Sequence, residues 1–150
     1  MYEPIAHIPL LIWGPGIEQR VDITTPTSCV DILPTLLHLA GEQIPDWAEG
    51  EILPTMSNED DRSNRSVYII DAKENHSLKP LETGTVALVK GKYKLVHYFG
   101  YEGLLDAYEL FDLENDPQEM VDLFPTHIEI SNELRQELKE KLGQVNRPFL

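Results

Sequence analysis

The stretch that decides the fold is residues 85–99, which read TVALVKGKYKLVHYF. Its two halves are rich in β-branched and aromatic residues, and a Lys-Gly-Lys turn centred on Gly91 separates them, a pattern typical of a β-hairpin. Runs of similar composition precede and follow this hairpin. The strands predicted in this way are residues 66–70, 85–89, 93–99 and 108–113. Short strands of this kind predict a small four-stranded antiparallel sheet.

A helix is predicted after the sheet, over residues 127–142. Thr126 and Glu129 have the spacing of a capping box at its start, and Gly143 is expected to stop it. The apolar residues that recur at every fourth position are Ile130, Leu134, Leu138 and Leu142. We expect this narrow stripe to pack against one face of the sheet.

The N-terminal third of the chain has a different pattern. Residues 5–13 (IAHIPLLIW) are nearly all apolar, which favours a strand buried on both faces, and a short extended piece is expected over residues 20–24. A helix follows, with Asp31 as the expected N-cap, Pro34 in the first turn and Gly41 as the stop. The apolar face of this helix is expected to consist of Ile32, Leu33, Leu36, Leu37 and Ala40.

Residues 42–65 divide the chain, because their composition changes to Pro, Asp, Glu, Asn and Ser. We therefore expect one structural part over residues 1–55 and a second over residues 56–150. The first contains the apolar strand and its helix, and the second contains the antiparallel sheet and the terminal helix. The expected fold class is α/β, or α+β for a fragment of this length.

The composition is that of a soluble globular protein, with 41% hydrophobic and 25% charged residues. Asp and Glu outnumber Lys and Arg 26 to 12, giving a formal net charge of -14, so nucleic acid is not an expected partner. A membrane is not expected either, because no apolar run approaches the roughly 20 residues of a spanning helix. Cys29 is the only cysteine, which excludes an intrachain disulfide and a cysteine-based zinc cluster.

The histidines do not form a predicted metal or catalytic pair. No two of the five have the i, i+4 spacing that places two ligands on one helical face. They are His7, His38, His76, His97 and His127. Each is interpreted as structural or solvated, and His7 is the strongest candidate for a ligand contact because it interrupts an apolar strand.

A dense group of carboxylates is the other candidate metal site, because calcium takes oxygen ligands. The group consists of Asp112, Glu114, Asp116 and Glu119. An EF-hand loop counted from Asp112 would need Gly and Glu where the sequence has Pro117 and Leu123. The group is therefore interpreted as a tight turn in which the Asp116-Pro117 dipeptide fixes the backbone.

Ser28 and Cys29 were tested as nucleophiles because they precede a predicted helix, whose N-terminus can activate a thiol. Neither lies in a G-x-S-x-G motif, and no His with an acidic partner is assigned to either. Cys29 is interpreted as a small buried residue. We therefore assign no catalytic, cofactor-binding or metal-ligating residue in this chain.

Three stretches carry a resemblance to a known family. The first is residues 2–16, YEPIAHIPLLIWGPG, and the second and most specific is residues 30–41, VDILPTLLHLAG. The third joins residues 92–96, KYKLV, to residues 109–119, ELFDLENDPQE. In their order and spacing they resemble the C-terminal portion of the sulfatase family, within the alkaline-phosphatase-like superfamily.

The resemblance implies a place for each part of the chain in a larger enzyme. Residues 1–55 would be the closing strand and helix of the large sulfatase α/β domain, and residues 56–150 its C-terminal antiparallel-sheet subdomain. The implied parent reaction is the hydrolysis of sulfuric esters. The role implied for this chain is architectural, with a loop such as residues 72–83 or 100–108 shaping one wall of the substrate cleft.

The resemblance also implies that the catalytic groups of the family lie elsewhere. The sulfatase nucleophile is a formylglycine made from the Cys or Ser of a C/S-x-P-S/A-R motif, whereas Cys29 is followed by Val30 and Asp31 and lacks the Pro and the Arg. The family's calcium ligands lie upstream of the first stretch. Calcium and formylglycine are thus implied for the intact parent and not for this chain, which is expected to be inactive alone.

The chain begins at Met1, immediately before Tyr2 and Glu3 of the first stretch and so within the motif, which predicts a truncated chain. Its implied partners are the missing N-terminal catalytic domain and, for the parent enzyme, a sulfate-ester substrate. Residues 5–13 would then lack the strands with which they pair in the parent. We expect either self-association through this exposed strand or disorder of about the first 40 residues.

Two alternative functions remain. His7 stands where many sulfatases have Arg, which leaves the subfamily open. The first alternative is a phosphate or phosphonate ester hydrolase of the same superfamily. The second is a free-standing, non-catalytic binding module whose acidic surface would be its contact face.

Overall fold

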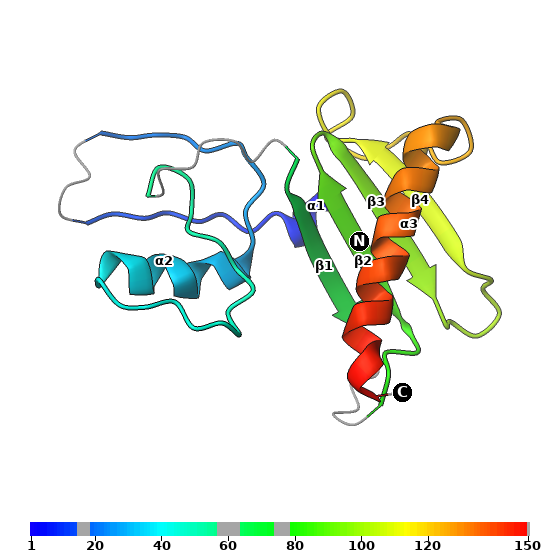
Figure 1. The fold of residues 1–150 in the computed structure, drawn as a ribbon. Coiled ribbons are helices and arrows are strands. Elements are labelled where there is room, and N and C mark those ends of the chain that lie inside the picture. The colour runs from blue at the N-terminus through cyan, green and yellow to red at the C-terminus, as the bar shows by residue number, and fades with distance from the viewer. Residues whose placement is uncertain (15–18, 57–63, 74–78, 150) are drawn as a thin grey trace. The chain divides into compact units, whose positions relative to one another are not determined.

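The computed structural model describes residues 1–14, 19–56, 64–73 and 79–149 (Figure 1). The chain divides into two compact units, one formed by Met1–Ile8 together with Tyr68–Leu150 and the other by Pro9–Val67. Each unit is described by itself below. None of the described helices is long and apolar enough to cross a membrane.

The first unit is built on a four-stranded antiparallel sheet with the strand order β1-β2-β3-β4, as predicted. The strands are β1 Ser66–Ala72, β2 Gly84–Lys90, β3 Tyr93–Phe99 and β4 Ala107–Asp112. The predicted hairpin is confirmed, because Lys90 pairs with Tyr93 and leaves a two-residue turn of Gly91 and Lys92. Gly91 has a φ of 55°, which a glycine adopts without steric cost.

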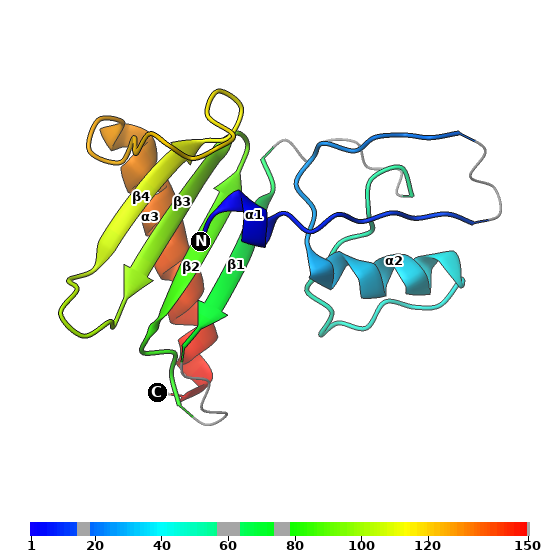
Figure 2. The same cartoon turned by 180° about the vertical axis from the view of Figure 1, so that it is seen from behind.

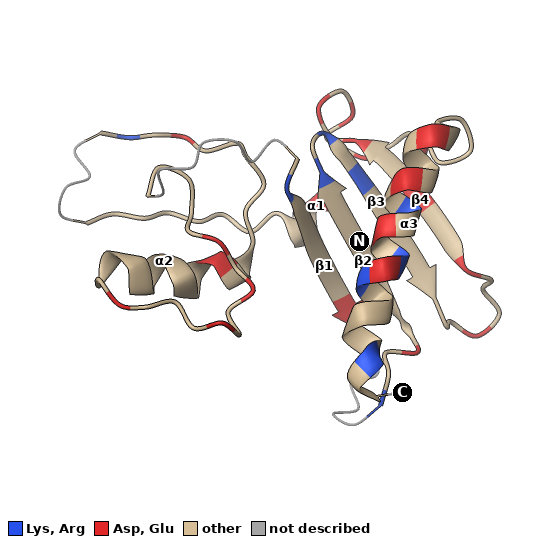
Figure 3. Ribbon diagram, in the orientation of Figure 1, with Lys and Arg blue, Asp and Glu red and all other residues tan. Residues whose placement is uncertain are grey.

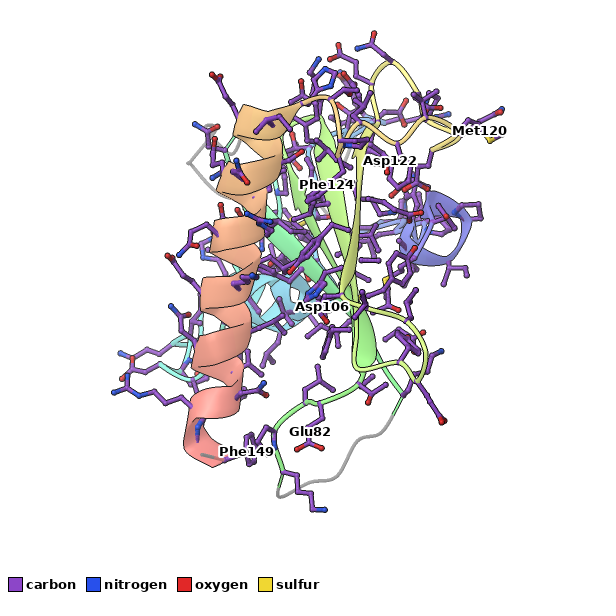
Figure 4. The ribbon with its side chains drawn as sticks, turned by 90° about the vertical axis from the view of Figure 1, so that its right-hand side faces the viewer. Glu82, Asp106, Met120, Asp122, Phe124 and Phe149 are labelled. Atoms are coloured by element: carbon purple, nitrogen blue, oxygen red, sulfur yellow. The ribbon has the colours of Figure 1, made fainter. Side chains whose placement is uncertain are left out.

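One face of the sheet is covered by α3, Ile128–Asn146, which crosses all four strands (Figure 1). The hydrophobic core between them consists of Val86, Leu88, Leu95, Leu110, Leu134 and Leu138. Ile130 and Leu142 are half-buried and pack against the same core, so the predicted apolar stripe is confirmed. Figure 4 shows this arrangement edge-on, with α3 on one side of the sheet and Phe124 between the two layers.

The predicted start of this helix is correct to within one residue, but its predicted capping box and its predicted stop are wrong. Thr126 donates its hydroxyl hydrogen bond to the Leu123 carbonyl, and the N-cap His127 makes no side-chain cap bond. The helix also continues through Gly143 to Asn146, and a 3₁₀ turn, Arg147–Phe149, follows. Gly143 does not stop it because the last turn is anchored: the Asn146 side chain hydrogen-bonds both the N–H and the carbonyl of Leu81.

The opposite face of the sheet carries the N-terminal segment, including the short helix α1, Glu3–Ala6 (Figure 2). A second, smaller core lies on this face, and Met1 packs against it. Its fully buried members are Ala87, Val96 and Phe111. The strand alternation therefore places apolar residues on both faces of β2 and β3, which is why both faces need cover.

The strand predicted over residues 5–13 is wrong. Residues 3–6 are helical, and residues 7–14 have no regular structure. A strand requires a neighbour that accepts and donates its backbone hydrogen bonds, and no described segment pairs with this one. Its side chains are accordingly exposed, Leu11 to 94% and Trp13 to 87%. Residues 20–24 likewise form no strand.

The second unit contains one α-helix, α2, Ile32–Leu39, among its described residues, after a 3₁₀ turn, Cys29–Asp31. Gly41 stops it as predicted, with a φ of 72° and paired hydrogen bonds from Gly41 to His38 and from Glu42 to Leu37. The predicted apolar face is present but faces solvent. Ile32, Leu33, Leu36 and Ala40 are exposed, and Leu37 is half-buried.

Replacing Leu134 by Ala tests the packing of α3 on the sheet. Leu134 is fully buried, so the change leaves a cavity, and we expect the free energy of unfolding to fall by about 2–5 kcal/mol. Ile128→Ala in the same helix is the control, because Ile128 is 58% exposed and should cost less than about 0.5 kcal/mol. Urea unfolding followed by far-UV circular dichroism measures both. Equal losses would contradict this packing.

Candidate functional site

A fully buried lysine lies at the centre of the first polar cluster, on the sheet face that carries α1. Lys94 of β3 has no exposed surface, and its Nζ atom lies 3.0 Å from Glu3 Oε1 and 2.8 Å from Glu119 Oε1. The Glu3 backbone N–H also donates to Glu119 Oε2 at 2.5 Å. We call these three residues the Lys94 cluster. They join the N-terminal segment, the sheet and the turn after β4.

Glu119 has a φ of 55°, a left-handed conformation that is uncommon outside glycine. The ion pair with Lys94 and the bond from the Glu3 backbone hold it there. Such strained positions persist only where the surrounding contacts determine them. The glutamate that ends the third sequence stretch, 109–119, therefore has a structural function in this unit.

A tyrosine-glutamate pair lies beside the Lys94 cluster on the same face. Tyr98 Oη donates to Glu109 Oε2 at 2.7 Å, and the Met1 amino group lies 3.3 Å from Tyr98 Oη. Burial and the hydrogen bond to Glu109 raise the pKa of Tyr98, so the phenol stays protonated at neutral pH. This pair can anchor the N-terminal segment, but it offers neither a nucleophile nor a base.

The acidic group after β4 is the tight turn that the sequence predicted. Asp112 accepts hydrogen bonds from the backbone N–H groups of Glu114 and Asn115 and pairs with Lys92 at 2.8 Å. The hydrogen bond from Lys92, followed by those from Asn115, lowers the pKa of Asp112 to about 2. Asp116 caps the next residues by accepting from the Met120 and Val121 amides.

The second unit has a polar cluster of its own, centred on Asp31. This carboxylate is fully buried. It accepts hydrogen bonds from the two terminal guanidinium nitrogens of Arg65, at 2.6 and 2.5 Å. It also accepts the backbone N–H groups of Ser28 and Glu51. Burial alone would raise the pKa of Asp31, but these hydrogen bonds outweigh it and hold the pKa below its ordinary value.

Asp31 occupies the N-cap position of α2, as predicted, but its side chain does not cap that helix. Asp31 makes no cap bond to α2, and instead it is the acidic partner in a capping box whose N-cap is Ser28. The Thr35 hydroxyl donates to the Asp31 carbonyl and accepts from the Leu53 amide, which ties the following loop to the helix. A Cβ atom on Gly50 would lie 2.1 Å from the Val30 carbonyl oxygen, so only glycine fits there.

The candidate nucleophile and histidines do not come together. Cys29 is exposed, which contradicts its prediction as a buried residue, because it begins the 3₁₀ turn whose buried side is Asp31. His7 is 76% exposed at its side chain, 3.8 Å from Glu3, so it does not interrupt a strand. His97 is the buried histidine, in an aromatic stack on β3 and β4. His76 lies outside the described residues.

Internal pairs hold these clusters together. Asp31 is paired with Arg65, Glu119 with Lys94, and Glu109 with the phenol of Tyr98. Among the residues that the structure describes, no group of three or more His, Cys, Asp or Glu side chains could hold a metal ion. These pairs hold together segments that are far apart in the sequence, which is a structural role.

Sequence analysis missed both buried clusters. Lys94 and its partners are separated by 91 residues in one case, and Asp31 and Arg65 by 34. In the sequence alone, each residue of such a pair looks the same as an ordinary charged residue on the surface. The one local signal is the period of two in β3, which puts Lys94 on the same face as the apolar Val96.

The charged surface does not gather at one contact face. Asp and Glu are spread along α3 and the loops of the first unit, and Lys and Arg lie among them (Figure 3). Lys90 of β2, for example, lies 2.8 Å from Glu137 and 3.5 Å from Glu133 of α3. This gives no support to the alternative of an acidic binding module.

Solved structures of sulfatases share this fold. The putative sulfatase yidJ from Bacteroides fragilis matches with a TM-score of 0.61 and 26% identity, over 79% of this chain and 25% of that one. The protein BT4656, solved in complex with its substrate D-glucosamine-2-N,6-O-disulfate, matches with a TM-score of 0.58 and 27% identity over the same shares. The fold is thus that of the C-terminal region of an alkaline-phosphatase-like sulfatase.

The family is shown by the sequence as well. Residues 1–147 match the family described as "N-sulphoglucosamine sulphohydrolase, C-terminal", and the chain belongs to this family. The expected resemblance to sulfatases is confirmed.

Curated relatives are also sulfatases. Arylsulfatase K of Bos taurus is 33% identical over 145 residues, or 93% of this chain and 26% of the relative. Choline-sulfatase of Rhizobium meliloti is 38% identical over 125 residues, or 81% and 22%. Delta 4,5-hexuronate-2-O-sulfatase of Bacteroides thetaiotaomicron is 35% identical over 129 residues, or 81% and 25%. The chain thus spans about a quarter of these relatives, and the matches favour a sulfatase-like hydrolase region over a phosphate or phosphonate ester hydrolase.

Replacing Lys94 by Met tests whether its cluster holds the first unit together. The change leaves the buried carboxylate of Glu119 without its cation, close to the partly exposed carboxylate of Glu3, and we expect the free energy of unfolding to fall by about 3–5 kcal/mol. Lys73→Met is the matched control, because it removes an ion pair of the same 2.8 Å length that is half exposed. Urea unfolding should barely change for the control. A Lys94 variant as stable as the control would contradict the role of the cluster.

Proposed function

We propose that this chain is the non-catalytic C-terminal region of a sulfatase whose whole chain hydrolyses sulfate esters. Its function is architectural: it closes the large domain with residues 1–55 and adds a sheet-and-helix subdomain with residues 56–150. Two observations support this proposal: the buried charges of Asp31, Lys94 and Glu119 are held in structural pairs, and large apolar side chains of the second unit face solvent.

The substrate class follows from the relatives by their shared chemistry. Their names specify an aryl, a choline, a hexuronate and an amino-sugar sulfate, which differ in the alcohol or amine and share the sulfate group. We therefore propose a sulfate ester as the substrate of the whole protein. The group that carries the sulfate is selected by residues outside this chain together with its loops.

The catalytic cofactors of a sulfatase do not fit the residues of this chain. Cys29 lacks the following Pro and Arg of the formylglycine motif. The carboxylates first considered for calcium are engaged: Asp112 with Lys92, Asp116 with backbone amides, and Glu119 with Lys94. Formylglycine and calcium would belong to the partner of this chain, the N-terminal catalytic domain.

The surface proposed to meet that domain lies in the second unit. It consists of the irregular segment 9–13 and the solvent-facing side of α2, and we call it the α2 face. Its most exposed large residues are Leu11, Trp13, Leu36 and Leu39. Covering each such side chain is worth about 1.5–3 kcal/mol, so the α2 face has a strong tendency to bind apolar surface. The length of the relatives supports the catalytic domain as its occupant.

A loop of the first unit is proposed to form part of the substrate cleft. Residues 100–106 connect β3 to β4 and carry Leu104 and Leu105, which are 49% and 90% exposed. Exposed leucines beside Asp106 suit contact with the carbon skeleton of a sulfated ligand. The second candidate loop, residues 72–83, lies partly outside the described residues.

Self-association of the isolated chain tests the α2 face. Without the catalytic domain we expect two copies to cover each other's apolar residues, so light scattering should give a mass well above 17.1 kDa. The double variant Leu11→Asp/Trp13→Asp should shift the mass toward the monomer. Leu105→Asp is the control, because Leu105 is equally exposed but lies in the first unit. A monomeric parent chain, or an equal effect of the control, would count against the proposal.

A further inference from the structure

A buried histidine lies in a stack of aromatic rings on the face of the sheet that α3 covers. His97 of β3 is 5% exposed, and its ring lies parallel to that of Tyr108 on β4, with centroids 4.1 Å apart and an angle of 5° between the planes. The centroid of the Phe99 ring lies 5.0 Å from that of the histidine, and Phe124 stacks on Tyr108 at 5.3 Å. This arrangement holds the imidazole between hydrophobic surfaces.

The polar atoms of the stack have no hydrogen-bond partners in the structure. Neither ring nitrogen of His97 forms a hydrogen bond, and neither does the Tyr108 hydroxyl, although all three atoms are buried. A buried polar group without a partner is costly, and a charged imidazole in this place would be far costlier than a neutral one. The site therefore accommodates the neutral form of His97.

The charged groups around His97 come from two elements. Asp106, in the loop before β4, has its Oδ2 atom 3.6 Å from His97 Nε2, and its side chain is 63% exposed (Figure 4). Lys139 of α3 faces His97 and repels a positive charge on it, while Arg135 of α3 faces Tyr108. The β2 residue that pairs with His97 is the apolar Val86. The carboxylate of Asp106 therefore favours a positive charge on His97, whereas burial and Lys139 disfavour it.

The loop that carries Asp106 is held chiefly at its ends. Gly100 and Gly103 have φ values of 69° and 77°, and Leu104 bonds back to Tyr101 within the loop. Tyr101 reaches the sheet through its hydroxyl, 2.7 Å from that of Thr85. The His97–Tyr108 stack adjoins the end of the loop that enters β4, so opening of the stack would free that end.

We propose that the His97–Tyr108 stack is an acid-sensitive clasp, in which neutral His97 keeps the stack closed and the loop 100–106 in place, and protonation of His97 opens both. The inference concerns this chain alone and does not depend on the proposed sulfatase function.

The direction follows from linkage between protonation and conformation. Burial lowers the pKa of His97 below its ordinary value of 6.5, with Asp106 opposing this shift and Lys139 adding to it. In an open state the solvated ring would titrate near 6.5. His97 binds a proton more weakly in the closed state than in the open state. Protonation of His97 therefore favours the open state. The closed clasp is therefore fully stable above pH 6.5 and weakens as the pH falls through the lowered value.

Histidine-selective NMR of the whole chain tests the clasp. With the ring carbons of histidine labelled, we expect His97 to titrate with a midpoint below its ordinary value of 6.5, and the amide resonances of residues 100–106 to shift or broaden over the same pH range. A midpoint at or above 6.5 would overturn the proposal. So would loop resonances that stay unchanged while His97 titrates.

Three variants separate the clasp from general acid unfolding. His97→Phe keeps the aromatic stack without the titration, so the loop resonances should lose their response. Asp106→Asn removes the attraction that favours the charged ring, so the midpoint of His97 should move to lower pH, and a rise would contradict the geometry. His38→Gln, at an exposed position of α2, is the control and should leave the response unchanged. A loop response that persists in His97→Phe would assign it to another group.

Discussion

Burial of the α3 stripe against the sheet is the interaction on which the first unit depends. Strands of six or seven residues form a stable sheet only when a hydrophobic face is covered, for example by a helix. Leu134 and Leu138 supply that surface by closing over Leu88, Leu95 and Leu110. The strand order, the hairpin and the position of the turn after β4 all follow from this one packed layer.

The other face of the same sheet is held differently. Its small apolar core is supplemented by the Lys94 cluster, in which two carboxylates from distant segments meet one buried ammonium group. The Asp31–Arg65 pair has the same function in the second unit, where it joins α2 to the segment that enters β1. Removing either partner of such a pair leaves an uncompensated charge. The stability of the fold therefore depends strongly on these residues.

The sequence predicted an element of the fold correctly where adjacent residues determine that element, and incorrectly where contacts with distant segments determine it. The hairpin at Gly91 and the stripe through Leu134 were predictable, because turn chemistry and periodicity are properties of adjacent residues. Residues 5–13 were predicted as a strand from composition alone, but a strand exists only with a partner. The stop at Gly143 failed for a similar reason, since a distant contact from Asn146 to Leu81 extends the helix.

The candidate site shows the same division. The turn at Asp112 was predictable from Asp116-Pro117, whereas Lys94 gave no signal because its two partners come from segments far away in the sequence. His97 was one of five similar histidines, and only the pairing of β3 with β4 places it beside Tyr108. Chemistry that is assembled by tertiary contacts cannot be read from spacing along the chain.

The central claim is that the α2 face is built to be covered by the catalytic domain of a sulfatase. Amide hydrogen exchange tests it most directly, by comparing residues 9–13 and 32–39 in this chain with the same residues in the longer protein that contains it. We predict that exchange of both segments slows by at least about a hundredfold in the longer protein, because their backbone becomes paired and buried. Equal exchange in the two proteins would contradict the claim.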